Sequence, residues 1–206
     1  MSASEKYDRL ADGFSEREYA DPVGYAARRA RTILDLGPPL AAGAHVLDLC
    51  CADGIMAPPL IAHGLRYTGV DLSPNMIEAA RRRNPGVTFV EARMEDYEPP
   101  APVDVTICLR SFYLAEDQLG FFREVAGYTK VKFVFDLWRI THPPGPVLDD
   151  LGAAGFTHIE LRSFFVPQRR STPRAALPLL ATLERTGPLA TLLSRRFGPT
   201  FCCAYR

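Results

Sequence analysis

The chain has 206 residues, of which 47% are hydrophobic and 23% charged, a composition ordinary for one globular domain with a substantial core. No stretch reaches the roughly 18 apolar residues that a membrane-spanning helix needs, and the polar opening MSASEKYDRLADG lacks an apolar signal core. We therefore expect a single cytoplasmic domain over residues 1–206.

The formal net charge is zero, but the charges are unevenly distributed along the chain. From Arg162 to Arg206 there are eight arginines and one acid, Glu184, so this end is strongly basic and the rest is acidic. The simple interpretation is a solvated helix face. The alternative is a surface close to an anionic substrate or to membrane headgroups.

The five cysteines give no indication of a metal site. None has C-x-x-C spacing, and no histidine lies at zinc-ligand spacing from them. Each lies in an apolar, strand-like context, where a free cysteine is usually a small packing residue. We predict buried thiols and no metal, with a redox or metal role as the minor alternative.

The chain opens with helical patterns that precede a regular alternation of strands and helices. Residues 3–20 are polar with spaced aromatics, and a second helix begins at Asp21-Pro22 and runs to about Leu36. These two helices are expected to form a cap over residues 1–40. The alternation that follows predicts a mostly parallel sheet in a core over residues 41–165.

Within that core the expected strands are residues 44–50, 66–71, 87–91, 103–109, 130–137 and 157–165, and the expected helices are 53–64, 73–83, 115–126 and 146–154. Residues 173–196 then have helical spacing that is broken by Pro178 and Gly187-Pro188, which predicts two short helices in a lid-like insert over 166–198. The final stretch, 199–206, contains TFCCAY and reads as the last strand.

The core is organised around VLDLCCADG, residues 46–54. An apolar run that holds Asp48 is followed by small residues, by Gly54 and then by a helical pattern. This predicts a buried strand, a tight turn that a ligand can approach, and a helix N-terminus with unpaired N–H groups. A second strand ends at Asp71, one βαβ step later. An acid at that position is placed to bind ribose hydroxyls.

VLDLCCADG followed by YTGVDLSPNMIEAAR resembles the class I S-adenosylmethionine-dependent methyltransferases of the small-molecule type. The usual first motif of that family is D-x-G-x-G-x-G, whereas this chain reads Asp48-x-Cys50-x-Ala52-x-Gly54, so that two of three glycines are replaced. The resemblance implies an α/β, Rossmann-like, seven-stranded, mostly parallel sheet with helices on both faces, an antiparallel last strand and an N-terminal helical cap. It also implies S-adenosyl-L-methionine as the cofactor.

The resemblance further implies roles for individual residues. Asp71 would clasp the ribose diol, Leu72 and Met76 would flank the adenine, and Met94 would bond the adenine edge, although Arg93 stands where the family has an aspartate. The full set expected to bind the cofactor is Tyr7, Asp48, Cys50, Ala52, Gly54, Asp71, Leu72, Met76, Met94, Glu95 and Cys108.

The acceptor is expected at residues 108–113, because ligands of open α/β sheets bind outside the carboxyl ends of the strands. Here His142 and Tyr113 are the candidates for a catalytic base or substrate contact, against surface or loop positions. Arg110 suits an anionic substrate group, against a solvent-facing arginine. Trp138 suits a substrate pocket wall, against core packing.

We therefore predict a methyltransferase that acts on a small molecule, of the kind found in secondary metabolism, by direct displacement. No nucleic-acid partner is expected, because neither an N/D-P-P-Y/W signature nor an RNA-binding appendage is present. Two alternatives stay open: a cyclase or isomerase that keeps the cofactor, and a non-catalytic partner subunit that has lost it through Cys50 and Ala52. The acceptor, the methylated atom and the oligomeric state are not set by these patterns.

Overall fold

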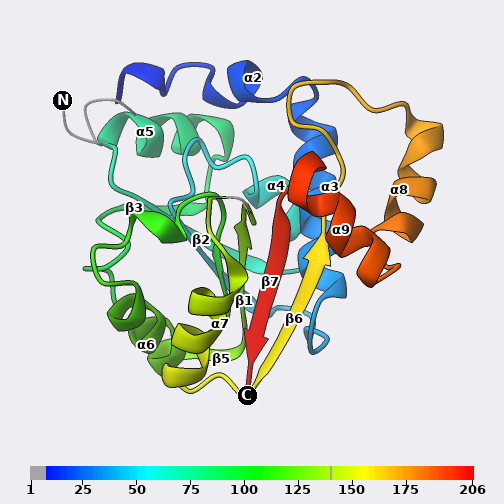
Figure 1. The fold of residues 1–206 in the computed structure, drawn as a ribbon. Coiled ribbons are helices and arrows are strands. Elements are labelled where there is room, and N and C mark those ends of the chain that lie inside the picture. The colour runs from blue at the N-terminus through cyan, green and yellow to red at the C-terminus, as the bar shows by residue number, and fades with distance from the viewer. Residues whose placement is uncertain (1–7, 140) are drawn as a thin grey trace.

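The computed structural model describes residues 8–139 and 141–206, which form one sheet with helices on both faces (Figure 1). The strand order is β3-β2-β1-β4-β5-β7-β6. The strands are β1 (His45–Leu49), β2 (Arg66–Asp71), β3 (Thr88–Glu91), β4 (Val103–Cys108), β5 (Thr129–Leu137), β6 (His158–Ser163) and β7 (Thr200–Tyr205). Strand β7 lies antiparallel between β5 and β6, and the pairings from β3 to β5 are parallel. The predicted fold class is confirmed.

The helices divide between the two faces of the sheet. On one face α3 (Pro22–Asp35), α4 (Ala57–Ala62) and α5 (Pro74–Arg83) pack in one apolar cluster, and on the other face α6 (Gln118–Tyr128) and α7 (Pro144–Ala153) pack in a second. Successive strand residues such as Val46 and Leu47 enter opposite clusters, because side chains alternate across a strand. The two clusters hold the sheet between them.

The helix starts follow local capping chemistry. The Ser73 hydroxyl accepts the Met76 N–H at 3.1 Å at the start of α5, and Asp21 accepts the Gly24 N–H at 3.0 Å at the start of α3. At the other end of α3, the buried Lys132 ammonium donates to the Leu36 carbonyl. A cation there satisfies carbonyls that the helix leaves unpaired.

Three expected helices differ in extent from the structure. The pattern over 3–20 is interrupted at Gly13, whose φ of 63° separates helical residues 8–10 from α2 (Phe14–Glu18). Helix α4 is shorter than the expected 53–64, because the turn after β1 extends to Met56. The expected 115–126 helix begins instead at Gln118, where Asp117 caps it, after a 3-10 turn, η1 (Phe112–Leu114).

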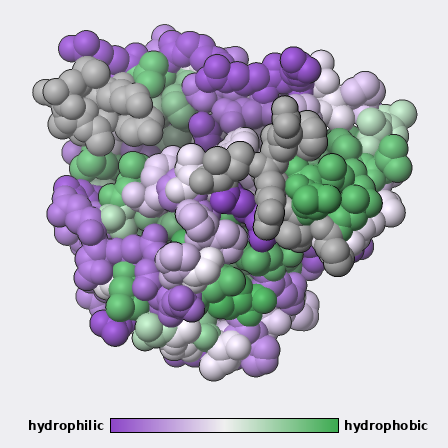
Figure 2. Space-filling model, in the orientation of Figure 1, coloured by the Kyte–Doolittle hydropathy of each residue, from purple (hydrophilic) through white to green (hydrophobic). Residues whose placement is uncertain are grey.

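The segment between β6 and β7 carries a 3-10 turn, η2 (Arg174–Ala176), and two helices, α8 (Leu177–Leu183) and α9 (Pro188–Phe197). Figure 2 shows an apolar patch over α8 and α9, where Leu179, Leu189 and Leu192 are exposed. None of the helices in the described part of the chain has both the length and the apolar character that a bilayer crossing requires. A membrane-surface role for this basic end stays a prediction.

Candidate functional site

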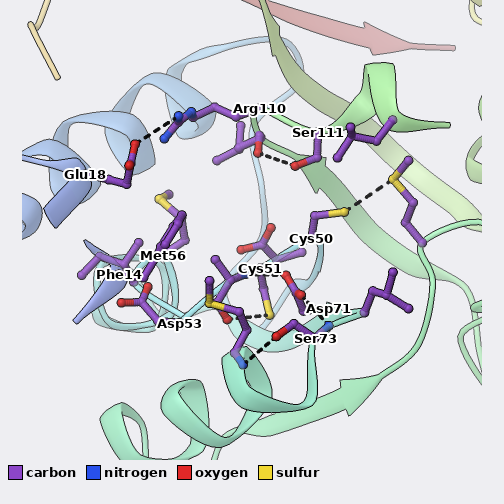
Figure 3. Close-up of a pocket in the computed structure, with 18 of the residues that line it drawn as sticks. Phe14, Glu18, Cys50, Cys51, Asp53, Met56, Asp71, Ser73, Arg110 and Ser111 are labelled. Atoms are coloured by element: carbon purple, nitrogen blue, oxygen red, sulfur yellow. Dashed lines mark hydrogen bonds and ion pairs between the residues drawn. The ribbon is translucent and has the colours of Figure 1, made fainter. Parts of the chain in front are cut away.

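A cavity of about 480 Å³ lies at the carboxyl ends of β1, β2 and β4 (Figure 3), and α2 contributes Phe14 and Glu18 to its wall. Ten of the residues predicted for the site line it: Asp48, Cys50, Ala52, Asp71, Leu72, Met76, Met94, Glu95, Arg110 and Tyr113. Strand ends and helix starts that are distant in sequence therefore meet in one concave space, as expected for an open α/β sheet.

The turn after β1 has a left-handed backbone at all three glycine positions of the motif, although two of the three glycines are replaced. Cys50 has a φ of 60°, Ala52 of 49° and Gly54 of 70°, all in the left-handed region. A residue with a Cβ costs about 1–2 kcal/mol there. At Gly54 a Cβ would lie 2.8 Å from Asn84 Nδ2 and 2.9 Å from Phe89 Cζ, so only glycine fits. The two replaced glycines therefore strain the turn and leave its path intact.

Asp71 closes this turn from the end of β2. Its Oδ2 accepts the Ala52 N–H at 2.9 Å, and its Oδ1 accepts the Ser73 N–H at 3.0 Å. Burial raises the pKa of the Asp71 carboxyl, and the backbone N–H groups oppose that rise. Each carboxylate oxygen retains a further lone pair, so the oriented group can still accept from two hydroxyls in the cavity.

Asp48 is a buried acid in the cavity wall. Its side chain is 2% exposed and accepts the Tyr67 hydroxyl, while burial raises its pKa to about 7. A cationic group in the cavity would favour the ionised form, because an opposite charge at close range offsets desolvation. Asp48 is thus suited to an ammonium group.

Arg29 is a site residue that the sequence analysis did not identify. It is 3% exposed, lines the cavity and donates to Asp136 at 2.7 Å, and its guanidinium lies near the rings of Tyr25 and Phe201. Its Nε is buried with no hydrogen-bond partner among the described residues. The available signal was its spacing, because Tyr25, Arg29 and Ile33 occupy one apolar stripe of α3.

Arg110 joins this cluster from the loop after β4. It has a φ of 63°, and its backbone N–H donates to Asp136. Its guanidinium donates to the Tyr19 hydroxyl at 3.2 Å and lies 3.5 Å from the Glu18 carboxylate, at the end of α2. Glu18 and Tyr19 were not predicted, since nothing in a local pattern indicates that α2 meets β4.

A second acid that was missed, Asp53, anchors the N-terminal segment. It accepts the Ser15 N–H at 3.1 Å and the Ser15 hydroxyl at 2.6 Å, and it pairs with Arg83 at 2.8 Å. This buried contact joins α2 to the turn after β1 and to the end of α5. It keeps Phe14 in the cavity wall.

The wall expected to face the adenine is formed by Met94, Glu95 and their neighbours. The Met94 sulfur lies 3.5 Å from the Cys50 thiol. Arg93, which departs from the expected aspartate, pairs with Glu95 at 2.9 Å and with Glu116 at 3.0 Å. The arginine therefore forms an ion-pair network at the rim of the cavity.

The other predicted site residues lie outside the cavity wall. Cys108 is fully buried at the end of β4, and Gly54 lies within the turn. Trp138 is 41% exposed beyond β5, and His142 stacks on Tyr113 at a centroid distance of 4.6 Å. His142 thus reaches the cavity only through Tyr113, and the roles of these residues stay predictions. Tyr7 lies outside the described residues.

The predicted lid, residues 166–198, contributes no described residue to the cavity wall. It reaches the site through Gln168, which donates to Glu18 at 3.1 Å, and through Arg169, which lies 3.7 Å from the same carboxylate. Its segment near η2 packs along α3, where Val166 and Leu177 face Tyr25 across a second, smaller cavity. A lid function for this insert remains a prediction.

Known proteins resemble the chain in both sequence and fold. A family model described as "Methyltransferase domain" matches residues 46–132. A trans-aconitate 2-methyltransferase of Methylobacterium nodulans is 41% identical over 93 residues, which cover 42% of this chain and 35% of the relative. The chain spans less than half of the length of the curated relatives of that name that it matches first, at 35%, 44% and 41%.

Two solved structures extend the likeness to the whole chain. The putative methyltransferase in complex with the activator Trm112 from Haloferax volcanii has a TM-score of 0.70 at 20% identity, covering 97% of each chain. Phosphoethanolamine N-methyltransferase 2 of Haemonchus contortus, in complex with S-adenosyl-L-methionine, has a TM-score of 0.70 at 15% identity, covering 100% of this chain and 60% of the other. At these identities the likeness is one of fold.

Proposed function

Because the chain belongs to the class I S-adenosylmethionine-dependent methyltransferase family, we propose that it methylates a small-molecule acceptor by direct displacement. The observation that carries this proposal is the contact of Asp71 with the Ala52 N–H across the strained turn. That contact fixes an acid beside a turn which small side chains leave open to a ligand.

The residues present fit S-adenosyl-L-methionine. Asp71 can accept from ribose hydroxyls, and Asp48 can hold the ammonium of the methionine part. Arg29 lines the cavity and would place a positive charge near the carboxylate of that part. Leu72 and Met94 offer apolar surface to the adenine.

When bound, the cofactor would supply a methyl group on a positively charged sulfur. An acceptor lone pair can attack that methyl carbon, with the sulfur as leaving group, without further activation. An acceptor that carries a proton would have to pass it to a group of the protein or to water, because the cofactor would supply only the methyl group and keep the electron pair of its bond on sulfur. The residues of this chain orient the reactants and exclude water, with Phe14 and Tyr19 closing the cavity. Alignment can supply roughly 7–11 kcal/mol of barrier reduction.

A small acceptor is supported by the size of the cavity, about 480 Å³, and by the names of the curated relatives, trans-aconitate 2-methyltransferases. Tyr113 lines the cavity and is our candidate to receive a proton from the acceptor, with His142 stacked behind it. A cytoplasmic location and a role in secondary metabolism are further parts of the proposal.

Calorimetry with S-adenosylmethionine and S-adenosylhomocysteine tests cofactor binding, and transfer of a labelled methyl group to a panel of small acceptors tests catalysis. Gly54→Ala and Gly43→Ala provide a matched pair, because both positions have positive φ but only Gly54 lacks room for a Cβ. We expect Gly54→Ala to abolish binding and Gly43→Ala to retain it. A wild-type chain that binds neither compound would refute the proposal.

A further inference from the structure

The charged side chains of the cavity wall are mostly committed to one another. Its described members are six acids and three arginines: Glu18, Asp48, Asp53, Asp71, Glu95, Glu116, Arg29, Arg93 and Arg110. Asp53 is satisfied by Ser15 and Arg83, both rim glutamates pair with Arg93, and the charge of Arg29 is balanced by Asp136. Under the proposed function, Asp48 and Asp71 serve the cofactor.

Of the charged residues in the wall, Glu18 and Arg110 are thus the two that neither a close ion pair nor the proposed cofactor contacts occupy. The N···O distance between them is 3.5 Å, whereas Arg29–Asp136, Arg83–Asp53 and the two pairs of Arg93 with the rim glutamates lie between 2.7 and 3.0 Å. The two side chains keep 24% and 33% of their surface exposed. A long, partly exposed ion pair gains little energy from its own contact. Arg169, the other cation near Glu18, lies 3.7 Å away and is 76% exposed, so it too holds the carboxylate only weakly. Both charges of the Glu18–Arg110 pair are therefore available to a ligand at little cost.

The two charges are nevertheless held in place from behind. Tyr19 accepts from the Arg110 guanidinium, Asp136 accepts from its backbone N–H, and Gln168 donates to Glu18. Figure 3 shows Glu18 and Arg110 across the cavity from Asp71 and Ser73, which is the side opposite the ribose position. A fixed anion and a fixed cation thus face the space left for the acceptor.

The balance of the wall also excludes one class of acceptor. Arg110 is the one cation of the lining that no described carboxylate holds within 3.0 Å, so the wall offers a single available positive charge. Trans-aconitate carries three carboxylates. Moving them from water into the cavity would be costly unless several cations of the wall were available to pair with them. The cavity thus differs in charge from what such an acceptor needs, whatever the relatives methylate.

The geometry points to a zwitterionic acceptor: an ammonium on Glu18 and a single carboxylate on Arg110, replacing the long contact between those two side chains. This inference rests on the proposed function and narrows it to a substrate class. Arg110 offers a planar donor pair that matches one carboxylate, and Glu18 offers an acceptor for an ammonium. The pair would bind the two charged groups of the acceptor and does not determine which of its atoms is methylated.

Binding in the presence of saturating S-adenosylhomocysteine tests the inference. The probes are neutral α-amino acids, the amines and carboxylic acids that lack one of their charges, and trans-aconitate. We expect at least one amino acid to bind about tenfold or more tighter than its amine, its acid and trans-aconitate, since each charged hydrogen bond contributes to that ratio. Tighter binding of trans-aconitate, or no response to any zwitterion, overturns the inference.

Substitutions assign the preference to the pair. Glu18→Gln should remove the advantage of the amino acid over the carboxylic acid, and Arg110→Gln should remove its advantage over the amine, while Arg110→Lys retains part of it. Glu78→Gln and Arg123→Gln make the same charge changes on exposed helix positions away from the cavity and should alter nothing. Unchanged selectivity in Glu18→Gln and Arg110→Gln overturns the inference.

The S-adenosylhomocysteine affinity separates this outcome from failure of the proposed function. All five variants should keep it within about twofold, because the pair lies outside the cofactor contacts. If the wild-type chain binds no cofactor, the proposed function fails. If it binds the cofactor but prefers trans-aconitate, only the zwitterion inference fails.

Discussion

The two halves of the cavity are built in different ways. The cofactor half comes from one βαβ unit, in which Asp71 and the turn at Ala52 are neighbours on adjacent parallel strands. The other half, called the acceptor half although Arg29 also adjoins the methionine part of the cofactor, is assembled from long-range contacts. Its residues are Glu18 and Arg29 of the N-terminal helices, Arg110 after β4 and Asp136 of β5. One half is fixed by local backbone geometry, and the other by long-range ion pairs. Four substitutions test that difference.

The largest effect is expected in the acceptor half, at the buried ion pair. Arg29→Met leaves Asp136 without its cation in the interior, and breaking such a pair costs about 3–5 kcal/mol. We expect the free energy of unfolding, measured with urea, to fall by that amount. Arg31→Met, on the exposed side of the same helix, should change it by less than about 0.5 kcal/mol. Equal effects at the two positions would contradict a structural role for the pair.

In the cofactor half, we expect Asp71→Ala to weaken cofactor binding by more than it lowers the free energy of unfolding. The loss of charged hydrogen bonds of about 1.5–3 kcal/mol each predicts an affinity for S-adenosylhomocysteine roughly 100-fold weaker by calorimetry. Glu91 ends the neighbouring strand in register with Asp71 but does not line the cavity. Glu91→Ala should therefore bind as the wild type does, and unaltered binding by Asp71→Ala would show that the acid has no part in it.

Asp48 predicts a pH effect on binding. Its pKa of about 7 means that raising the pH from 6 to 8 ionises it in the free protein. If the ionised form holds the cofactor ammonium, affinity for S-adenosylhomocysteine rises by up to about tenfold over that interval. Asp48→Asn should abolish this dependence. A profile identical in the wild type and the variant would exclude Asp48 as its source.

The same group affects stability with the opposite sign. The folded protein keeps a proton on Asp48 that the unfolded chain releases near its ordinary pKa of 3.8. The Asp48 contribution to stability is therefore present below that value and declines as the pH rises to about 7. Urea unfolding at several pH values should show a smaller decline for Asp48→Asn than for the wild type.

The smallest effect is expected at the strained turn. Ala52→Gly removes the strain of an alanine with positive φ, but it also raises the conformational entropy of the unfolded chain. We therefore expect it to stabilise the protein by at most about 1 kcal/mol. Ala79→Gly in α5 should instead destabilise it by about 0.5–1 kcal/mol, because a helix interior needs no positive φ. The difference between the two thermal unfolding midpoints measures the strain, and a loss of stability at both sites would argue against it.

These two halves also differ in how far the sequence predicted them. The alternation of strands and helices, and the positions of Asp48 and Asp71 one βαβ step apart, follow from periodicity and spacing, which are local properties. Arg29 and Glu18 were missed because the path of α2 and α3 across the sheet is set by tertiary contacts such as Ser15 with Asp53. A buried arginine on an apolar stripe is the one local clue to that half.

The predicted ends of two helices were wrong for a related reason. Gly13 breaks the first helix, and the turn after β1 delays α4 to Ala57, because a backbone in the left-handed region cannot continue a helix. Positive φ at Cys50 and Ala52 is invisible to propensity, since neither residue favours it. Resemblance to a glycine motif identified the turn, whereas its strain is seen only in the positive φ angles of the folded chain.

Strand β7 has a consequence for how the molecule is made. It lies between β5 and β6, although it is the last strand in chain order. During synthesis β6 leaves the ribosome before β7, its strand partner in the described sheet, exists, and the edge of β5 is bare for the same interval. Both edges can pair with other nascent chains until TFCCAY arrives. The sheet can therefore close only after these residues leave the exit tunnel, and slow translation ahead of Thr200 would lengthen the exposure.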